Sequence, residues 1–212
     1  MTSVSQIAEP TVTAEQTESE QAEPTEEPAA ERNISALIAA NTDCIGWISI
    51  DGTNISYPVM HTPNDPQKYL RRSFHGQYSQ SGVPFLDRRC SMDSDNLIIY
   101  GHNMKNGTMF SSLRNYTDPA FCAAHPVIEF QTADGMEKYM VFAVAAVQKT
   151  DTWYSFIHAA DSTDFTEQTA AFLQKSLYDT GITPVYGQQL ITLSTCYGSG
   201  KNGRLIVAAV KL

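Results

Sequence analysis

Eight short apolar runs, each bounded by turn-forming residues, constrain the fold of this chain more than any other feature. Apolar and polar residues alternate in the first two runs, which is typical of β-strands, and Asp51-Gly52 between them favours a tight turn. Helical spacing occurs only in a few inserted segments and does not alternate with the strands, which argues against a doubly wound parallel fold. We therefore expect a mostly β protein whose eight strands form a mostly antiparallel, closed or nearly closed barrel. The runs are Ile48–Ile50, Ile55–Val59, GVPFLD, DNLIIYGH, PVIEFQT, EKYMVFAVAAVQKT, QQLITLSTC and RLIVAAVKL.

A short amphipathic helix is expected at the start of the folded region, because Ile34, Leu37 and Ile38 recur at helical spacing. Further helices are expected as insertions between strands. One of them opens at Asp118-Pro119, an N-cap residue followed by a proline at the first helical position. The inserted helices are predicted near 67–72, 109–113, after 118, and over 163–179, the last with Asp164 and Glu167 as capping residues and Gly181 as its stop.

The first 32 residues differ sharply in composition from the rest. They hold eight Glu and one Arg, contribute −7 of the total net charge of −9, and include no aromatic residue. Such a segment buries too little apolar surface to offset the entropy of ordering it. We expect residues 1–32 to be a disordered acidic spacer and residues 33–212 to be the folded domain. Because that domain is nearly neutral, no nucleic-acid partner is expected, and no apolar run approaches the roughly 20 residues of a membrane helix.

Four widely spaced cysteines form no C-x-x-C pair, and no histidine lies at zinc-ligand spacing from them. We therefore expect no metal site. Cys44, Cys90 and Cys122 are interpreted as small buried apolar residues, although sequence alone leaves disulfides open.

Cys196 differs from the other cysteines because it stands where an apolar run meets a Gly-rich loop. A thiol reacts as its thiolate, and a free pKa of about 8.5 leaves little thiolate at neutral pH, so a nucleophilic cysteine needs a cationic neighbour. Arg204 opens the next apolar run. If the two runs are adjacent strands, Arg204 returns beside Cys196, where it favours the thiolate and stabilises negative charge on an attacked carbonyl oxygen. A non-catalytic interpretation stays open, because a buried cysteine before a loop and a solvated arginine after it would give the same sequence pattern.

A proton donor for the leaving group is predicted at His102. This histidine ends the apolar run Leu97–Gly101, just as Cys196 ends its own run, whereas the other four histidines lie in polar, turn-like segments. Rigid strand ends are favourable positions for reactive side chains.

Together these motifs resemble the sortases, the cysteine transpeptidases of Gram-positive cell surfaces. The segments "TLSTC", followed by Arg204, and "YGHNMKNGTMF" occur in the order typical of the family, and the opening "NTDCIGWISIDGTNISYPVMH" resembles class B. The resemblance covers residues 33–212. It implies an eight-stranded β-barrel with an N-terminal helix and inserted helices. It also implies an N-terminal membrane anchor, which residues 1–212 do not contain.

The resemblance implies a role for each matched residue. Cys196 would be the nucleophile, His102 the general acid and base, and Arg204 the residue that steadies substrate and oxyanion. The implied substrate-groove residues are Ser194, Thr195, Tyr69, Leu70 and Asn64. No metal or cofactor is implied.

The implied reaction is cleavage of an Asn-Pro-x-Thr-x sorting motif at Thr, followed by transfer of the acyl group from a Cys thioester to an amine. The partners would be a surface protein and a cell-wall precursor or pilin lysine, at the extracellular face of a Gram-positive membrane. Two alternatives stay open: a cysteine peptidase that hydrolyses the same motif, and a non-catalytic surface adhesion or scaffold barrel.

Overall fold

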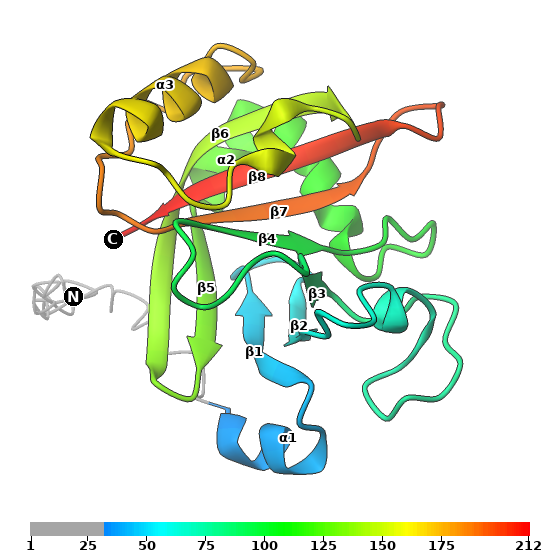
Figure 1. The fold of residues 1–212 in the computed structure, drawn as a ribbon. Helices are drawn as coiled ribbons and strands as arrows, with labels where there is room; N and C mark the ends of the chain where they lie inside the picture. The colour runs from blue at the N-terminus through cyan, green and yellow to red at the C-terminus, as the bar shows by residue number, and fades with distance from the viewer. Residues whose placement is uncertain (1–31) are drawn as a thin grey trace, which may run out of the picture. The chain divides into compact units, whose positions relative to one another are not determined.

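The eight predicted strands are present and close into a barrel (Figure 1). A computed structural model describes residues 32–212, which form one compact unit, and within them the strand order around the barrel is β1-β2-β3-β4-β7-β8-β6-β5. The predicted fold class is therefore confirmed. The predicted acidic spacer lies outside the described residues, apart from its last residue, Arg32. The strands are β1 (Cys44–Ser49), β2 (Ser56–Met60), β3 (Phe85–Leu86), β4 (Asn96–Tyr100), β5 (Val127–Thr132), β6 (Gly135–Gln148), β7 (Leu190–Cys196) and β8 (Gly203–Lys211).

Most neighbouring strands are antiparallel, but two pairs are parallel: β2 with β3, at Met60↔Phe85, and β4 with β7, through the register Asn96↔Leu190 to Tyr100↔Ser194. β7 in turn pairs antiparallel with β8, from Leu190↔Val210 to Cys196↔Arg204. Parallel neighbours end at the same edge of a sheet, and an antiparallel neighbour begins there. The carboxyl ends of β4 and β7 and the amino end of β8 therefore meet at one rim of the barrel.

The barrel interior is filled by the same apolar runs that predicted the strands. Ile99, Leu193 and Val207, which pair across three adjacent strands, have no solvent exposure. A buried run of this kind makes the strand ends rigid, because side chains in a close-packed core cannot shift without opening voids. The rim is therefore a fixed platform for the side chains that follow the strands.

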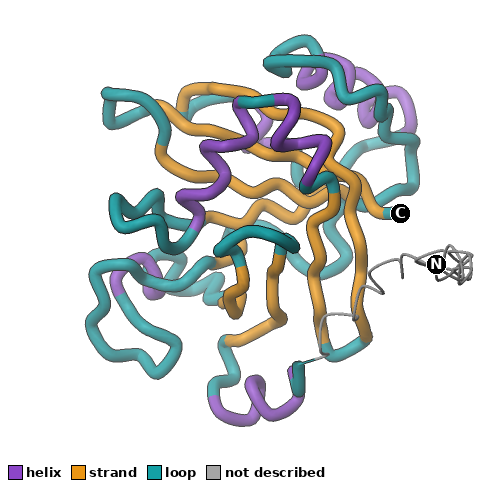
Figure 2. Tube along the Cα trace, turned by 180° about the vertical axis from the view of Figure 1, so that it is seen from behind, coloured by secondary structure: helices purple, strands orange, loops and turns teal. Residues whose placement is uncertain are grey.

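Short helices cover the barrel, and 3₁₀ segments (η) replace some of the predicted α-helices. α1 begins at Asn33, whose Oδ1 accepts a hydrogen bond from the Ala36 amide, and α2 begins at the predicted Asp118-Pro119 cap. Seen from behind in Figure 2, η2 and α2 lie across the strands. The segments are α1 (Ile34–Ala40), η1 (Lys68–Arg71), η2 (Phe110–Thr117), α2 (Pro119–Ala124), η3 (Thr152–Ser155) and α3 (Ser162–Leu173).

The inserted helix α3 is shorter than the predicted 163–179, and its predicted caps are wrong. Its N-cap is Asp161, while the Asp164 carboxylate reaches back to accept from the Ala160 amide at 3.0 Å. The helix ends well before Gly181. Beyond it, the Leu177 amide donates to the Val144 carbonyl of β6 at 2.8 Å. Pairing with the barrel thus replaces the last predicted helical turns.

Candidate active site

Cys196 and Arg204 stand opposite each other at the loop end of the β7–β8 hairpin. They are the last register pair of the two strands, as the sequence predicted. Cys196 is exposed, whereas Cys44, Cys90 and Cys122 are buried and unpaired, in agreement with their interpretation as apolar residues. The Arg204 guanidinium donates to the carbonyls of Lys201 and Gly203 at 3.1 and 2.8 Å. These bonds tie the guanidinium to the hairpin loop.

His102 reaches the same rim from β4. The Gly101 amide donates to the Ser194 carbonyl at 3.1 Å, which extends the β4–β7 pairing to the residue before His102. Position 101 must be glycine because a Cβ there would lie 2.5 Å from the Phe110 ring. A larger residue would push the chain away from β7 and carry His102 with it.

The ring of His102 is oriented by a backbone carbonyl from a different part of the chain. Its Nε2 lies 2.9 Å from the carbonyl oxygen of Leu70, at the end of η1. Because a carbonyl oxygen only accepts, Nε2 carries a proton in this arrangement. In the neutral ring, Nδ1 is then the nitrogen with a free lone pair, available to exchange a proton with a substrate.

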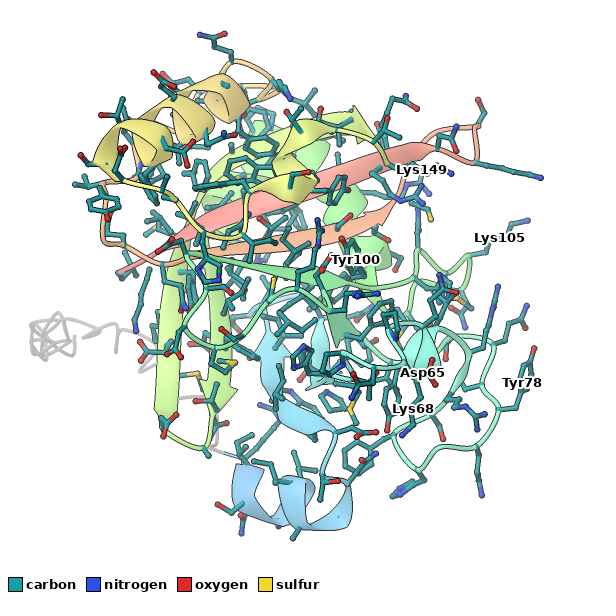
Figure 3. All side chains as sticks on the ribbon, in the orientation of Figure 1. Asp65, Lys68, Tyr78, Tyr100, Lys105 and Lys149 are labelled. Carbon is teal, nitrogen blue, oxygen red and sulfur yellow. The ribbon has the colours of Figure 1, made fainter. Side chains whose placement is uncertain are left out.

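One cavity of about 520 Å³ holds the side chains of all three candidate catalytic residues, Cys196, His102 and Arg204. We call it the catalytic cavity. It lies between η1 on one side and the end of β6 with η3 on the other. Figure 3 labels two of its lining residues, Tyr100 and, above it, Lys149. Residues at the ends of three strands thus line the same space.

Three of the five predicted groove residues also line the catalytic cavity: Leu70, Ser194 and Thr195. Ser194 and Thr195 are almost fully buried, and their hydroxyls are already paired. The Ser194 Oγ lies 2.7 Å from the Tyr154 hydroxyl, and Thr195 donates to the Gly101 carbonyl at 2.8 Å. These two residues therefore stabilise the cavity wall, and their hydroxyls are not free to bind a substrate.

The other two predicted groove residues do not line the catalytic cavity. The Tyr69 side chain is 1% exposed and packs in a small core with Cys44 and Met60. Its hydroxyl donates to Asp43 at 2.8 Å. Asn64 is exposed on the loop before η1. Neighbouring residues in η1 point in different directions, so that Leu70 faces the cavity while Tyr69 faces the core.

Sequence reasoning missed a polar network that forms the floor of the catalytic cavity. Arg89 makes a two-point contact with Asp87, with N–O distances of 2.9 and 2.8 Å, and Tyr100 donates to the same carboxylate at 2.8 Å. Arg89 also donates to the Tyr154 carbonyl in η3 at 2.6 Å. The network joins the β3–β4 connection to the segment that forms the opposite wall. Only the order Asp-x-Arg beside a strand signals it in the sequence.

The pKa of Asp87 shows that this network is charged. Burial alone would raise it, but the hydrogen bonds from Arg89 and Tyr100 together outweigh burial and hold the pKa below the usual aspartate range. A carboxyl whose pKa is lowered by folding stabilises the folded state above its unfolded pKa. That contribution is lost as pH falls through the lowered folded pKa.

Asp87→Asn should therefore reduce the free energy of unfolding at pH 7 by about 2 kcal/mol, because it removes charge-assisted hydrogen bonds from a buried carboxylate. The difference from the native protein should shrink as pH falls below the unfolded aspartate pKa and through the lowered folded pKa, where the native carboxylate also becomes protonated. Urea unfolding at several pH values measures both effects. The exposed Asp93 supplies the control, Asp93→Asn. If Asp87→Asn and Asp93→Asn lose the same free energy of unfolding at every pH, the network around Asp87 is not charged.

Neither a metal cluster nor a membrane-spanning helix is found among residues 32–212. No group of three or more His, Cys, Asp and Glu side chains in this part of the chain is arranged to hold a metal ion. No helix in it is long and apolar enough to cross a membrane.

Comparison with known proteins identifies the family. The Sortase domain family model matches residues 48–212. Sortase B of Listeria monocytogenes is 35% identical over 159 residues, covering 74% of this chain and 63% of that protein's length. The solved Staphylococcus aureus sortase B-substrate complex has a TM-score of 0.78 at 26% identity and covers 84% of both chains. Clostridium perfringens sortase B also has a TM-score of 0.78, at 28% identity, over 84% of this chain and 98% of its own. The chain therefore belongs to the sortase family, and the three relatives named above are sortase B proteins.

Proposed function

We propose that this protein is a cysteine transpeptidase that cleaves a sorting motif at Thr and transfers the acyl group to an amine. One observation carries the proposal: Cys196, His102 and Arg204, from the ends of three adjacent strands, line one cavity. A nucleophile, a proton carrier and a permanent cation are the groups that acyl transfer requires. Residues 33–212 would be the catalytic domain.

In the first step the Cys196 thiolate attacks the carbonyl carbon of the substrate Thr. The guanidinium of Arg204 stabilises the negative charge that develops on the carbonyl oxygen. The C–N bond then breaks, and the departing amine takes the Nδ1 proton of the His102 imidazolium, which leaves the ring neutral. The products of this step are a thioester on Cys196 and a free C-terminal peptide fragment.

In the second step an acceptor amine attacks the thioester carbon. A new C–N bond forms, the C–S bond breaks, and the thiolate of Cys196 is restored. His102 takes the proton that the acceptor nitrogen loses, so the protein returns to its starting state. Arg204 stabilises the oxyanion again, because the second tetrahedral intermediate has the same geometry as the first.

The proposed substrate is a surface protein that bears an Asn-Pro-x-Thr-x type motif, and the proposed acceptor is an amine of a cell-wall precursor or pilin. The structural neighbour from Staphylococcus aureus is a sortase B-substrate complex, which supports the proposal that this fold binds a substrate. The proposed location is the extracellular face of a Gram-positive membrane.

Incubating the protein with a library of x-Pro-x-Thr-x peptides, with and without an added amine, tests the proposal. Mass spectrometry should detect amide adducts only when the amine is present. Cleavage to free carboxylic acids alone, unchanged by the amine, would favour a cysteine peptidase. The absence of any cleavage across the library would favour a non-catalytic barrel.

Arg204→Ala should lower kcat/KM for cleavage by roughly 10²- to 10³-fold, the usual effect of removing one oxyanion donor. Arg204→Lys should recover only part of this loss, because an ammonium cannot reproduce the bonds of a planar guanidinium. Peptide cleavage followed by chromatography measures both. If Arg204→Ala cleaves at the native rate, Arg204 does not stabilise the oxyanion.

A further inference from the structure

A second cavity lies behind the wall that carries the candidate catalytic residues. Its volume is about 550 Å³, and nearly all of its lining side chains are polar. They come from the β1–β2 turn, the loop after β4, η2 and the loop after β7. We call it the polar cavity. The proposed mechanism uses none of its lining residues.

The polar cavity and the catalytic cavity share one thin wall. His102 and Cys196 line the catalytic cavity, while the very next residues, Asn103 and Tyr197, line the polar cavity. Successive side chains of an extended chain point to opposite faces, which accounts for this alternation. The Asn103 side chain donates to the Cys196 carbonyl at 2.9 Å and closes the wall. The polar cavity therefore lies on the other side of this wall from Cys196 and His102, one residue along the chain from each.

Two cations line the polar cavity, and no carboxylate does. They are Lys105, on the loop after β4, and Arg114, in η2. Within residues 32–212 neither forms an ion pair with an acidic side chain, in contrast to Lys68, Arg89 and Lys175. Figure 3 shows Lys105 extending outward on the same side of the molecule as Lys149. Amides and hydroxyls fill the rest of the lining, so the cavity suits a polar ligand with negative charge.

The loop that forms one side of the polar cavity is held in a strained backbone conformation. Met109 has φ 57° and ψ −132°, a region that a residue with a side chain rarely adopts. The Met109 amide donates to the Tyr57 hydroxyl at 2.9 Å, and Asn54 donates to the Gly107 carbonyl at 3.3 Å. The surrounding structure thus imposes the loop's shape and keeps the cavity open.

We propose that the polar cavity binds the acceptor substrate and selects an amine whose peptide carries a free carboxylate. This inference rests on the proposed transpeptidase function and extends it to the second step. After the first step the acyl chain occupies part of the catalytic cavity, and an acceptor whose carboxylate is held in the polar cavity extends across the rim at His102 and Cys196 to reach the thioester. The acceptor carboxylate binds Lys105 and Arg114. The acceptor nitrogen forms a bond to the acyl carbon, the C–S bond breaks, and His102 takes the proton released by the nitrogen.

Two small acceptors that differ only in charge test this proposal. Triglycine has a free carboxylate, and triglycinamide has the same amine but a neutral end. The measured quantity is the ratio of amide product to hydrolysed product, because water and amine compete for the same thioester and changes in acylation rate cancel. The native protein should favour triglycine by roughly fivefold, a preference that falls as salt screens the charges.

Arg114→Gln combined with Lys105→Gln should remove the preference for triglycine, so that both acceptors give similar ratios. Lys138→Gln is the matched control, since it neutralises an exposed lysine in β6 that is paired with Glu129 and lines neither cavity. The control should keep the native preference.

The results separate this inference from the proposed function. If the native protein forms amide products but uses both acceptors equally at low salt, the acceptor-site proposal is wrong while transpeptidation stands. If the double variant or the salt titration leaves a native preference unchanged, Lys105 and Arg114 do not bind the carboxylate. If the native protein cleaves no sorting peptide at all, the proposed function itself fails.

Discussion

Replacing Cys196 by alanine should lower the rate of sorting-peptide cleavage by roughly 10⁴-fold or more, because no thioester can form without the sulfur. The loss should appear in kcat and not in KM, since the cavity that binds the peptide stays intact. Cleavage measured by chromatography at several peptide concentrations separates the two constants. Unchanged binding of the peptide to Cys196→Ala, measured by calorimetry, would confirm that only the chemistry is lost.

The buried cysteines provide the controls for that result. Burial raises the pKa of the Cys90 thiol to about 11 and also raises the pKa of Cys44 and Cys122, so these thiols stay protonated and unreactive at neutral pH. Cys122→Ala should therefore cleave the peptide at close to the native rate. Substantial peptide cleavage by Cys196→Ala would contradict Cys196 as the nucleophile. So would the loss of peptide cleavage in a Cys122→Ala protein that still folds.

Replacing His102 should slow cleavage by roughly 10³-fold, within the usual range for removal of a general acid. Two variants separate proton transfer from positioning. His102→Gln offers a side-chain amide that can donate to the Leu70 carbonyl, whereas His102→Ala cannot. Both should be slow if His102 carries the proton, and His102→Gln should be the more stable to urea. Near-native cleavage by His102→Gln would mean that the histidine only holds η1 in place.

An ester substrate gives an independent check on His102. An ester with a good leaving group needs little protonation as it departs, so His102→Gln should lose far less activity on the ester than on the amide. An equal loss on both substrates would indicate that His102 acts by shaping the cavity and not as an acid.

The fold and the catalytic rim were predictable because they follow from local patterns. The apolar runs ending at Gly101 and at Cys196 are long enough to specify buried strands, and the short Gly-rich loop before Arg204 fixes a hairpin. Once those runs are strands, Cys196 and Arg204 have to meet. The parallel pairing of β4 with β7, which brings His102 to the same rim, was not predicted, and only the family resemblance grouped His102 with Cys196 and Arg204.

The parts that sequence reasoning missed depend on side-chain direction and long-range contact. In η1 nothing in the sequence distinguishes Leu70, which faces the cavity, from Tyr69, which faces the core. The bond from Arg89 to the Tyr154 carbonyl joins residues 65 positions apart, and no local pattern encodes it. The early end of α3 has the same origin, since the Leu177 amide bonds to β6 and not within the helix.

The most direct test of the central claim is to trap the covalent intermediate. The protein is mixed with a sorting peptide, quenched in acid within seconds and digested, and the fragments are weighed by mass spectrometry. A thioester adduct is expected on the fragment that contains Cys196, and it should disappear when triglycine is added before the quench. Peptide turnover with no adduct, or with the adduct on any other residue, would contradict acyl transfer through Cys196.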